Sequence, residues 1–237
     1  MPKLKQYDAD HFEITIKHNK IKFANNPAQP TYIKNRVDRI MTKEPETIKW
    51  LDTHKPNSIF FDVGANIGIY SMYSAMVNNN KTFAFEPHAP TYKNLLDTIN
   101  LNTNCRAWCV ALGDDLQFTD IAIKNLHEGV ADNIVGETGE YLHGCITIPM
   151  DMMMRWHLLP QPDYIKIDVD GYEDKVIVGA KQTFKNAKSL LIEIDRKHIC
   201  WIDQIKDWGF ELTGIHKRNE EENNYIFENV RNSRMYK

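Results

Sequence analysis

The feature that most constrains the fold is a short apolar run that ends at a glycine and is followed by a helical stretch. Residues 59–63 read Ile-Phe-Phe-Asp-Val and stop at Gly64, which is typical of a strand buried on both faces. Further strands are expected at residues 82–85, 106–112, 164–168 and 189–194, and helices up to about Val77, at 91–101 and at 174–184. This alternation predicts an α/β fold, in which a doubly wound, mostly parallel sheet carries helices on both faces.

The N-terminal part of the chain has a different pattern. Residues 1–40 are expected to form an extension, because the apolar residues alternate over 12–23 and predict a hairpin. The α/β domain is expected to span 41–237. Its first helix is predicted to have Thr42 as its N-cap and Pro45 in its first turn.

Two later segments depart from the strand–helix alternation. Residues 113–149 contain a predicted strand at 118–123, several glycines and scattered acids, so they are interpreted as an insertion or flap. Near the end of the chain, 210–215 and 225–227 flank a charged turn. They predict a C-terminal hairpin that adds an antiparallel edge to the sheet.

Composition argues against several classes of function. The 29 Lys and Arg residues against 32 Asp and Glu give a net charge of −3, whereas general nucleic-acid binding needs a basic surface. The four cysteines form no C-x-x-C pair, so we expect reduced thiols and no zinc site. No signal peptide is visible, and no apolar run approaches the roughly 20 residues of a membrane span. We therefore expect a soluble, cytoplasmic protein.

The end of the first strand carries the strongest indication of a ligand site. The segment 62–68, Asp-Val-Gly-Ala-Asn-Ile-Gly, lets the backbone approach a ligand where a helix begins. Glu86 ends the second strand, and a carboxylate there can accept hydrogen bonds from both ribose hydroxyls. Both features belong at the carboxyl edge of the sheet, where they predict a nucleoside site.

Asn66 favours one nucleoside cofactor over another. A dinucleotide fingerprint has three glycines, but here Asn66 stands in the place of the second one, between Gly64 and Gly68. A side chain at that place would crowd a pyrophosphate. It suits a smaller polar tail, such as the amino acid end of S-adenosylmethionine.

Five motifs in order resemble the FkbM family of S-adenosylmethionine-dependent methyltransferases. They are DVGANIGIYS at 62–71, FEPH at 85–88, ALGD at 111–114, IKIDVDGYE at 165–173 and LLIEID at 190–195. The resemblance covers about residues 57–195. It implies a class I methyltransferase fold, which is Rossmann-like, and O-methylation, often of a hydroxyl on a sugar or natural product.

The resemblance also implies cofactor-binding roles for individual positions. The residues expected to contact the cofactor are Asp62, Gly64, Asn66 and Gly68 at the methionine end, Glu86 at the ribose, Pro87 and His88 beside it, and Ala111, Leu112 and Asp114 near the adenine. Asp114 follows a glycine, so a purely structural role as a turn former is an equal alternative.

Acidic residues follow the two later strands, where the resemblance places the methyl group and the acceptor. Asp168, Asp170 and Glu193 are the candidate catalytic residues, since a base assists methyl transfer to an alcohol. The family usually has Glu where this chain has Asp170, which weakens any role carried over to it. His198 is a less favoured candidate base. Lys166 is unusual within a strand buried on both faces, and we expect it to pair with an acid or point toward the site.

The same acids could instead hold a metal. Asp168, Asp170, Glu193 and Asp195 would supply the oxygen ligands that Mg²⁺ or Ca²⁺ prefers. Acids at strand ends also cap helices or bind substrate hydroxyls, so the metal is an alternative hypothesis.

The sequence thus favours an S-adenosylmethionine-dependent O-methyltransferase that acts on a hydroxyl of a sugar or glycan. An RNA ribose 2′-O-methyltransferase, an NAD-dependent oxidoreductase and a non-catalytic nucleoside-binding protein are the alternatives. We expect a small-molecule or glycan partner and neither general nucleic-acid binding nor a membrane span.

Overall fold

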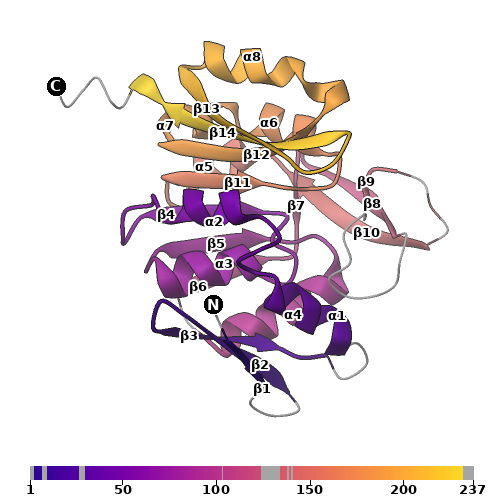
Figure 1. Ribbon diagram of the computed structural model, residues 1–237. Helices are drawn as coiled ribbons and strands as arrows, with labels where there is room; N and C mark the ends of the chain where they lie inside the picture. Colours follow the sequence, from indigo (N-terminus) through magenta and orange to yellow (C-terminus); the bar gives the residue numbers. More distant parts are fainter. Residues whose placement is uncertain are drawn as a thin grey trace.

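The structure is a computed structural model, and it describes residues 3–6, 10–26, 30–102, 104–123, 134–137, 139 and 141–231. A seven-stranded sheet with the order β13-β14-β12-β11-β4-β5-β6 forms its centre (Figure 1). The strands from β12 to β6 pair in parallel, and β14 runs antiparallel to both of its neighbours. This arrangement confirms the predicted α/β fold and its C-terminal hairpin.

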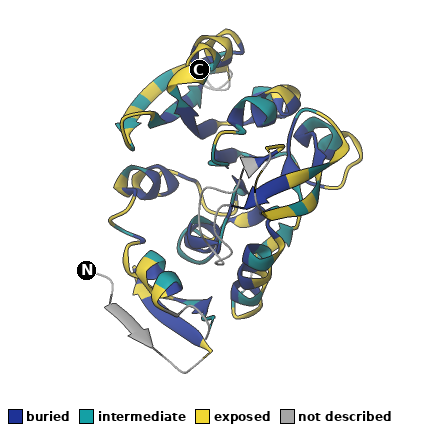
Figure 2. Ribbon diagram, turned by 90° about the vertical axis from the view of Figure 1, so that its right-hand side faces the viewer, coloured by how far each residue is buried: buried dark blue, intermediate teal, exposed yellow. Residues whose placement is uncertain are grey.

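The predicted buried strands of the sheet are found close to their expected positions. The strands are β4 (Ile59–Val63), β5 (Lys81–Phe85), β6 (Cys105–Trp108), β11 (Tyr164–Ile167), β12 (Ser189–Asp195), β13 (Phe210–Lys217) and β14 (Glu222–Asn229). Their residues alternate between two hydrophobic clusters, because successive side chains of a strand point to opposite faces. Figure 2 shows the resulting pattern, with buried strands inside and exposed residues on the outer sides of the helices.

Each cluster is covered by its own set of helices. One face packs against α5 (Met150–Arg155), α6 (Glu173–Gly179), α7 (Lys181–Asn186) and α8 (Cys200–Asp207). The other face packs against α1 (Pro30–Asp38), α2 (Pro45–Leu51), α3 (Ile69–Met72) with the π-helix η1 (Tyr73–Val77), and α4 (Ala89–Asn100). The methionine-rich α5 buries Met150 and Met153, as expected for a core helix.

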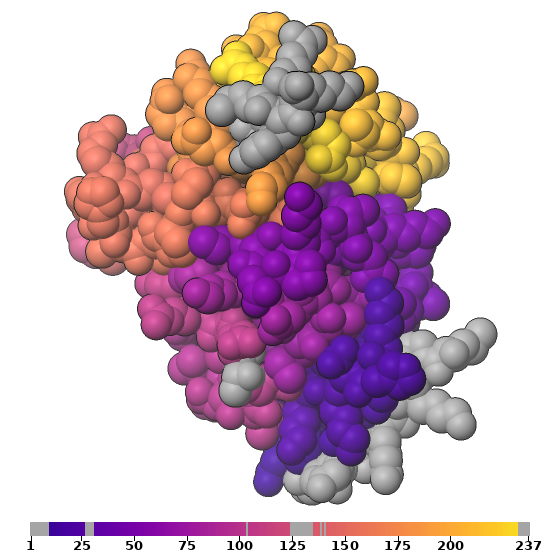
Figure 3. All heavy atoms as spheres, turned by 90° about the vertical axis from the view of Figure 1, so that its left-hand side faces the viewer, coloured from indigo at the N-terminus to yellow at the C-terminus, as the bar shows by residue number. Residues whose placement is uncertain are grey.

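The N-terminal residues form a small antiparallel sheet of β1 (Lys3–Gln6), β2 (His11–Ile16) and β3 (Asn19–Ala24). β2 and β3 are the predicted hairpin. Its apolar residues join the same cluster as α1 to α4, so the hairpin shares the core of the sheet's second face. Figure 3 shows this segment, in indigo, against the side of the domain. The division of the chain at residue 40 stays a prediction.

Three predicted elements differ from those observed. The first domain helix, α2, has Glu44 as its N-cap, while the Thr42 hydroxyl bonds to the Arg39 carbonyl. The expected strand at 106–112 splits into β6 and β7 (Ala111–Leu112), which belongs to a second sheet. The expected helix at 174–184 is interrupted at Ala180, because this residue has a non-helical backbone with φ −115° and ψ 7°. The preceding Gly179 packs against the Gly113 carbonyl with no room for a side chain.

The second sheet occupies the segment interpreted as an insertion or flap. It has the order β7-β10-β8-β9, formed with β8 (Gln117–Ile123), β9 (Ile134–Val135) and β10 (Tyr141–Ile148). β8 confirms the strand predicted at 118–123. Residues 124–133, 138 and 140 of this segment lie outside the described residues.

The register of the parallel strands brings four positions to one edge of the central sheet. Val63 of β4 pairs with Phe85 of β5 and with Ile167 of β11, and Ile167 pairs with Ile192 of β12. The residues that follow, namely Gly64, Glu86, Asp168 and Glu193, therefore emerge together. Gly64 can only be glycine here, because a Cβ would lie 1.8 Å from the Asp168 carbonyl oxygen and its φ is +78°.

We predict that Gly64→Ala destabilises the protein by more than about 3 kcal/mol, since the new methyl group overlaps the backbone of a neighbouring strand. Gly171→Ala is the matched control. Its φ of +92° is equally unfavourable for alanine, but a Cβ there meets nothing within 4 Å, so roughly 1–2 kcal/mol is expected. Urea unfolding of both variants measures the difference, and equal losses would contradict the steric argument.

Candidate active site

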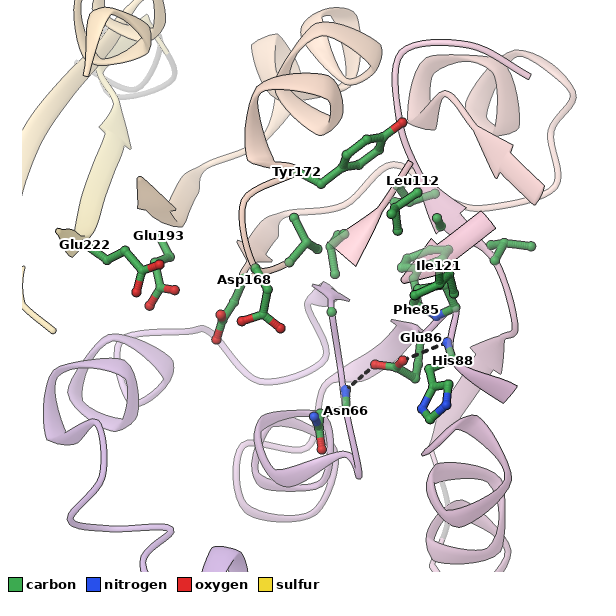
Figure 4. A pocket seen from close by; sticks show the side chains of 18 of the residues that line it. Asn66, Phe85, Glu86, His88, Leu112, Ile121, Asp168, Tyr172, Glu193 and Glu222 are labelled. Carbon is green, nitrogen blue, oxygen red and sulfur yellow. Dashed lines mark hydrogen bonds between the residues drawn. The ribbon is translucent and has the colours of Figure 1, made fainter. Parts of the chain in front are cut away.

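A cavity of about 1050 Å³, counted with its open mouth, lies at the carboxyl edge of the central sheet (Figure 4). Its wall includes most of the residues predicted from the sequence, namely Gly64, Asn66, Glu86, Pro87, His88, Ala111, Leu112, Asp168, Asp170 and Glu193. Asp62, Gly68, Asp114 and Asp195 are not part of the wall.

Glu86 is a buried acid of the cavity wall. One carboxylate oxygen accepts the backbone N–H of Asn66 and the other accepts that of His88, both at 2.9 Å. Figure 4 shows these two bonds holding the carboxylate beside the glycine loop. Burial raises the pKa of Glu86 to about 7, although both backbone bonds act in the opposite direction. The carboxylate is thus fixed in place, and each oxygen keeps a lone pair for a ligand hydroxyl.

The loop 64–68 is shaped by left-handed residues. Gly64, Asn66 and Gly68 all have positive φ, and Gly68 packs so closely on Leu95 that a Cβ would lie 2.6 Å from its side chain. Asp62 is fully buried behind the loop, where it accepts a hydrogen bond from the Ser71 hydroxyl at 2.6 Å. Asp62 and Gly68 therefore support the loop from behind, while Gly64 and Asn66 face the cavity.

One end of the cavity is apolar apart from a histidine. Phe85, Val110, Leu112, Ile121 and Val135 line it. The His88 Nδ1 lies 2.9 Å from the Thr91 hydroxyl, and its ring stacks on that of His143.

His88 brings a neutral polar atom to this apolar end. Its buried Nε2 has no hydrogen-bond partner among the described residues. Burial lowers the pKa of His88 to about 4, so the ring is neutral near pH 7. Asp114 instead pairs with Lys175 at 2.9 Å, outside this wall.

The opposite end of the cavity is charged, beginning with Asp168. Its carboxylate accepts a hydrogen bond from Lys166 Nζ at 2.6 Å, which explains the unusual lysine within β11. Burial acts to raise the pKa of Asp168, but Lys166 outweighs it and holds the value at about 2. The pair is therefore charged at neutral pH.

Glu193 is held by a residue that the sequence did not single out. Arg218, in the turn between β13 and β14, lies 2.7 Å from Glu193 through Nε and 2.9 Å from Glu44 through Nη1. Glu44 is fully buried and also pairs with Lys43 at 3.2 Å. Burial and the charge of Asp168 raise the pKa of Glu193 against the effect of Arg218.

Asp170 lies in a strained loop beside these acids. Its φ is +53° and that of the following Gly171 is +92°, so two consecutive residues are left-handed. The buried Glu173 closes the loop, since its Oε1 accepts the backbone N–H groups of Val169 at 3.1 Å and Gly171 at 3.3 Å. Backbone strain of this kind is concentrated at functional sites.

The four acids considered as an alternative metal site, Asp168, Asp170, Glu193 and Asp195, are not arranged as a group of metal ligands. The described part of the chain contains no group of three or more His, Cys, Asp or Glu side chains arranged for a metal. Lys166 forms an ion pair with Asp168, and Arg218 forms one with Glu193. Asp195 turns to the helical turn η2 (Arg196–His198), where it accepts the His198 backbone N–H at 2.9 Å.

Sequence reasoning missed several residues of the wall. Arg36, Lys43, Tyr172, Arg218 and Glu222 all line the cavity. Tyr172 falls within a recognised motif, and its ring packs near Gly113. The charged turn that contains Arg218 and Glu222 could have been flagged, because a C-terminal hairpin beside the last parallel strand brings its turn to that strand's carboxyl end. Arg36 and Lys43 carry no local signal.

Comparison with known proteins identifies relatives of this chain. A sequence model described as the Methyltransferase FkbM domain matches residues 62–226. The hexuronic acid methyltransferase AglP of Haloferax volcanii is 25% identical over 150 residues, which cover 61% of this chain and 59% of that protein. The chain thus matches less than two thirds of the relative's length.

The fold is shared with solved structures of a methyltransferase and a fibrillarin. Methyltransferase FkbM from Methylobacillus flagellatus has a TM-score of 0.52 at 15% identity, covering 73% of this chain and 44% of that one. The fibrillarin of Aeropyrum pernix, with natively bound S-adenosyl-L-methionine, has a TM-score of 0.53 at 9% identity, covering 95% and 97%. At these identities the similarity concerns the fold alone. Among the described residues, no helix is both long and apolar enough to cross a membrane.

We predict that the charge on Glu173 destabilises the fold above pH 4.5. Burial raises its pKa from 4.5 to about 7, so the folded state favours the protonated form. Stability is therefore lost as pH rises between these two values, by roughly 1–3 kcal/mol. Glu173→Gln keeps an oxygen for both backbone bonds but removes the charge. Its stability relative to the wild type should increase from pH 4.5 to 7 in urea unfolding, and a constant difference would contradict the assignment.

Proposed function

The chain belongs to the FkbM family of S-adenosylmethionine-dependent methyltransferases, and on that premise we propose that it transfers the methyl group to a hydroxyl of a sugar. The observation that carries this proposal is one continuous cavity with a glycine loop and Glu86 at one side and buried acids at the other. The similarity to the hexuronic acid methyltransferase AglP supports a sugar as acceptor.

The residues of the first part of the cavity fit S-adenosylmethionine. Glu86 would accept hydrogen bonds from the ribose hydroxyls, and the apolar wall with the unpartnered Nε2 of His88 would hold the adenine. The loop 64–68 would cradle the amino acid tail. The bound cofactor supplies an electrophilic methyl group, so the protein has to align the acceptor and exclude water.

The charged end suits an acceptor hydroxyl. Glu193 lies in the cavity wall with a raised pKa, which is the property of a general base that works near neutral pH. Arg218 fixes its side chain in one position. Asp170 is held in a strained loop. Its carboxylate would orient the acceptor by accepting hydrogen bonds from the hydroxyl groups of the acceptor. Asp168 is paired with Lys166, so it would influence the bound molecules through its negative charge.

The alternatives have less support. The net charge of −3 gives little attraction for an RNA backbone. Asn66, with a left-handed φ of +52°, places a side chain where a dinucleotide site needs glycine. A protein that only binds nucleosides would have no use for the buried acids beyond the cofactor region.

Mass spectrometry of candidate acceptors tests the proposed function. The wild-type protein would be incubated with S-adenosylmethionine and, separately, with glucuronate-containing glycans, neutral glycans and single-stranded RNA. We expect a gain of one methyl group on a sugar acceptor. Methylation confined to RNA, or of none of these under conditions where S-adenosylhomocysteine binds, would contradict the assignment of the acceptor.

We predict that Glu86→Ala weakens binding of S-adenosylhomocysteine by about 2–4 kcal/mol, because the ribose hydroxyls lose the carboxylate to which they donate two hydrogen bonds. Isothermal titration calorimetry measures the change. Glu222→Gln, at the other end of the same wall, is the matched control and should bind like the wild type. Unchanged affinity of Glu86→Ala would remove this residue from the ribose site.

We predict that Glu193→Gln lowers kcat by at least about 100-fold, since it removes the base while a side-chain oxygen still accepts the Arg218 hydrogen bond. A base must be unprotonated, so the wild-type rate should rise with pH through the raised pKa of Glu193. The variant should lose that dependence while keeping its affinity for S-adenosylhomocysteine. A variant with an unchanged pH profile would exclude Glu193 as the base.

A further inference from the structure

Arg36 is a cavity residue from the N-terminal segment, outside the part of the chain that the family model matches. It lies on α1, and its side chain is half-buried. One guanidinium nitrogen donates a hydrogen bond to the Tyr32 hydroxyl at 3.2 Å, and the guanidinium carbon lies 5.3 Å from the centre of the Tyr32 ring. The buried Nε has no hydrogen-bond partner among the described residues.

The other cations near the cavity are compensated by carboxylates. Lys166 pairs with Asp168, and both Lys43 and Arg218 pair with Glu44. Within the part of the chain that the structure describes, Arg36 has no carboxylate within 4 Å. A partly buried guanidinium without an anion is unfavourable, and its planar donors match a carboxylate in a two-bond geometry.

The position of Arg36 distinguishes the two ends of the cavity. Its charge acts on Glu86, whereas those of Lys43 and Arg218 act on Asp168. Arg36 therefore lies near Glu86, whereas Lys43 and Arg218 lie near Asp168. S-adenosylmethionine carries one carboxylate, on the tail that leaves its ribose.

We propose that Arg36 binds the carboxylate of the S-adenosylmethionine tail, a role that rests on the proposed cofactor site. The N-terminal segment then completes the cofactor site that the family motifs begin. The acidic end of the cavity would face the two positive groups of the cofactor, while Arg36 meets its negative group. The protein would thus orient the cofactor through both its positive groups and its carboxylate.

A double-mutant cycle between the protein and the ligand tests this role. Calorimetry would compare S-adenosylmethionine with decarboxylated S-adenosylmethionine, which keeps the ribose, sulfonium and amine. For the wild type, loss of the ligand carboxylate should weaken binding about 10- to 100-fold. For Arg36→Met the two ligands should bind almost equally, and Arg36→Lys should give an intermediate ratio because it makes a single charged contact.

The matched control is Lys34→Met, which removes a charge from the same helix where Lys34 is exposed and pairs with Asp38. It should retain the wild-type ratio. If Arg36→Met kept the wild-type ratio of affinities for the two ligands, the proposal would be overturned. This holds also if the variant instead raised KM for an acidic acceptor. Equal loss of both ligands in Arg36→Met would reveal a structural role and also overturn it. If the wild type bound neither ligand, the proposed cofactor itself would be wrong.

Discussion

The cavity depends on one constraint, which is that four parallel strands end in register at the same edge of the sheet. This register places Gly64 against the backbone of Asp168 and sets Glu86 and Glu193 on either side. Because parallel strands are buried on both faces, their ends are the places where polar side chains can emerge into a shared space. The position of the site thus follows from the topology.

Charge compensation then divides the cavity into two regions. Near Glu86, backbone N–H groups hold a carboxylate in an otherwise apolar wall. At the other end, Lys166 and Arg218 hold Asp168 and Glu193, and Glu44 links Arg218 to the start of α2. Buried charges persist only when they are paired. Lys166 therefore keeps Asp168 ionised, while Glu193, held by Arg218, has a raised pKa, and both acids lie beside a region that suits a nucleoside. Such an arrangement fits a positively charged methyl donor and a polar acceptor.

The sequence predicted those parts that depend on local pattern. Apolar runs at 59–63 and 189–194 predicted the strands, and the loop 64–68 with Glu86 predicted part of the cavity wall. Contacts between distant segments could not be read in this way. Arg218 pairs with Glu44, although more than half of the chain separates them in the sequence. No periodic pattern of residues predicts such a pair. The turn after β6 also could not be predicted, because residues 106–112 have the pattern of a single strand. The strand is divided because β7 pairs with β10, which comes about 30 residues later in the sequence.

The central claim is that this cavity is an S-adenosylmethionine site whose ribose is held by Glu86. A crystal structure of the protein with S-adenosylhomocysteine tests it most directly. The account predicts the ribose hydroxyls on the Glu86 carboxylate, the adenine against the apolar wall near His88, and the homocysteine tail over the loop 64–68. Binding of the ligand elsewhere on the protein, or in this cavity with its ribose away from Glu86, would contradict it.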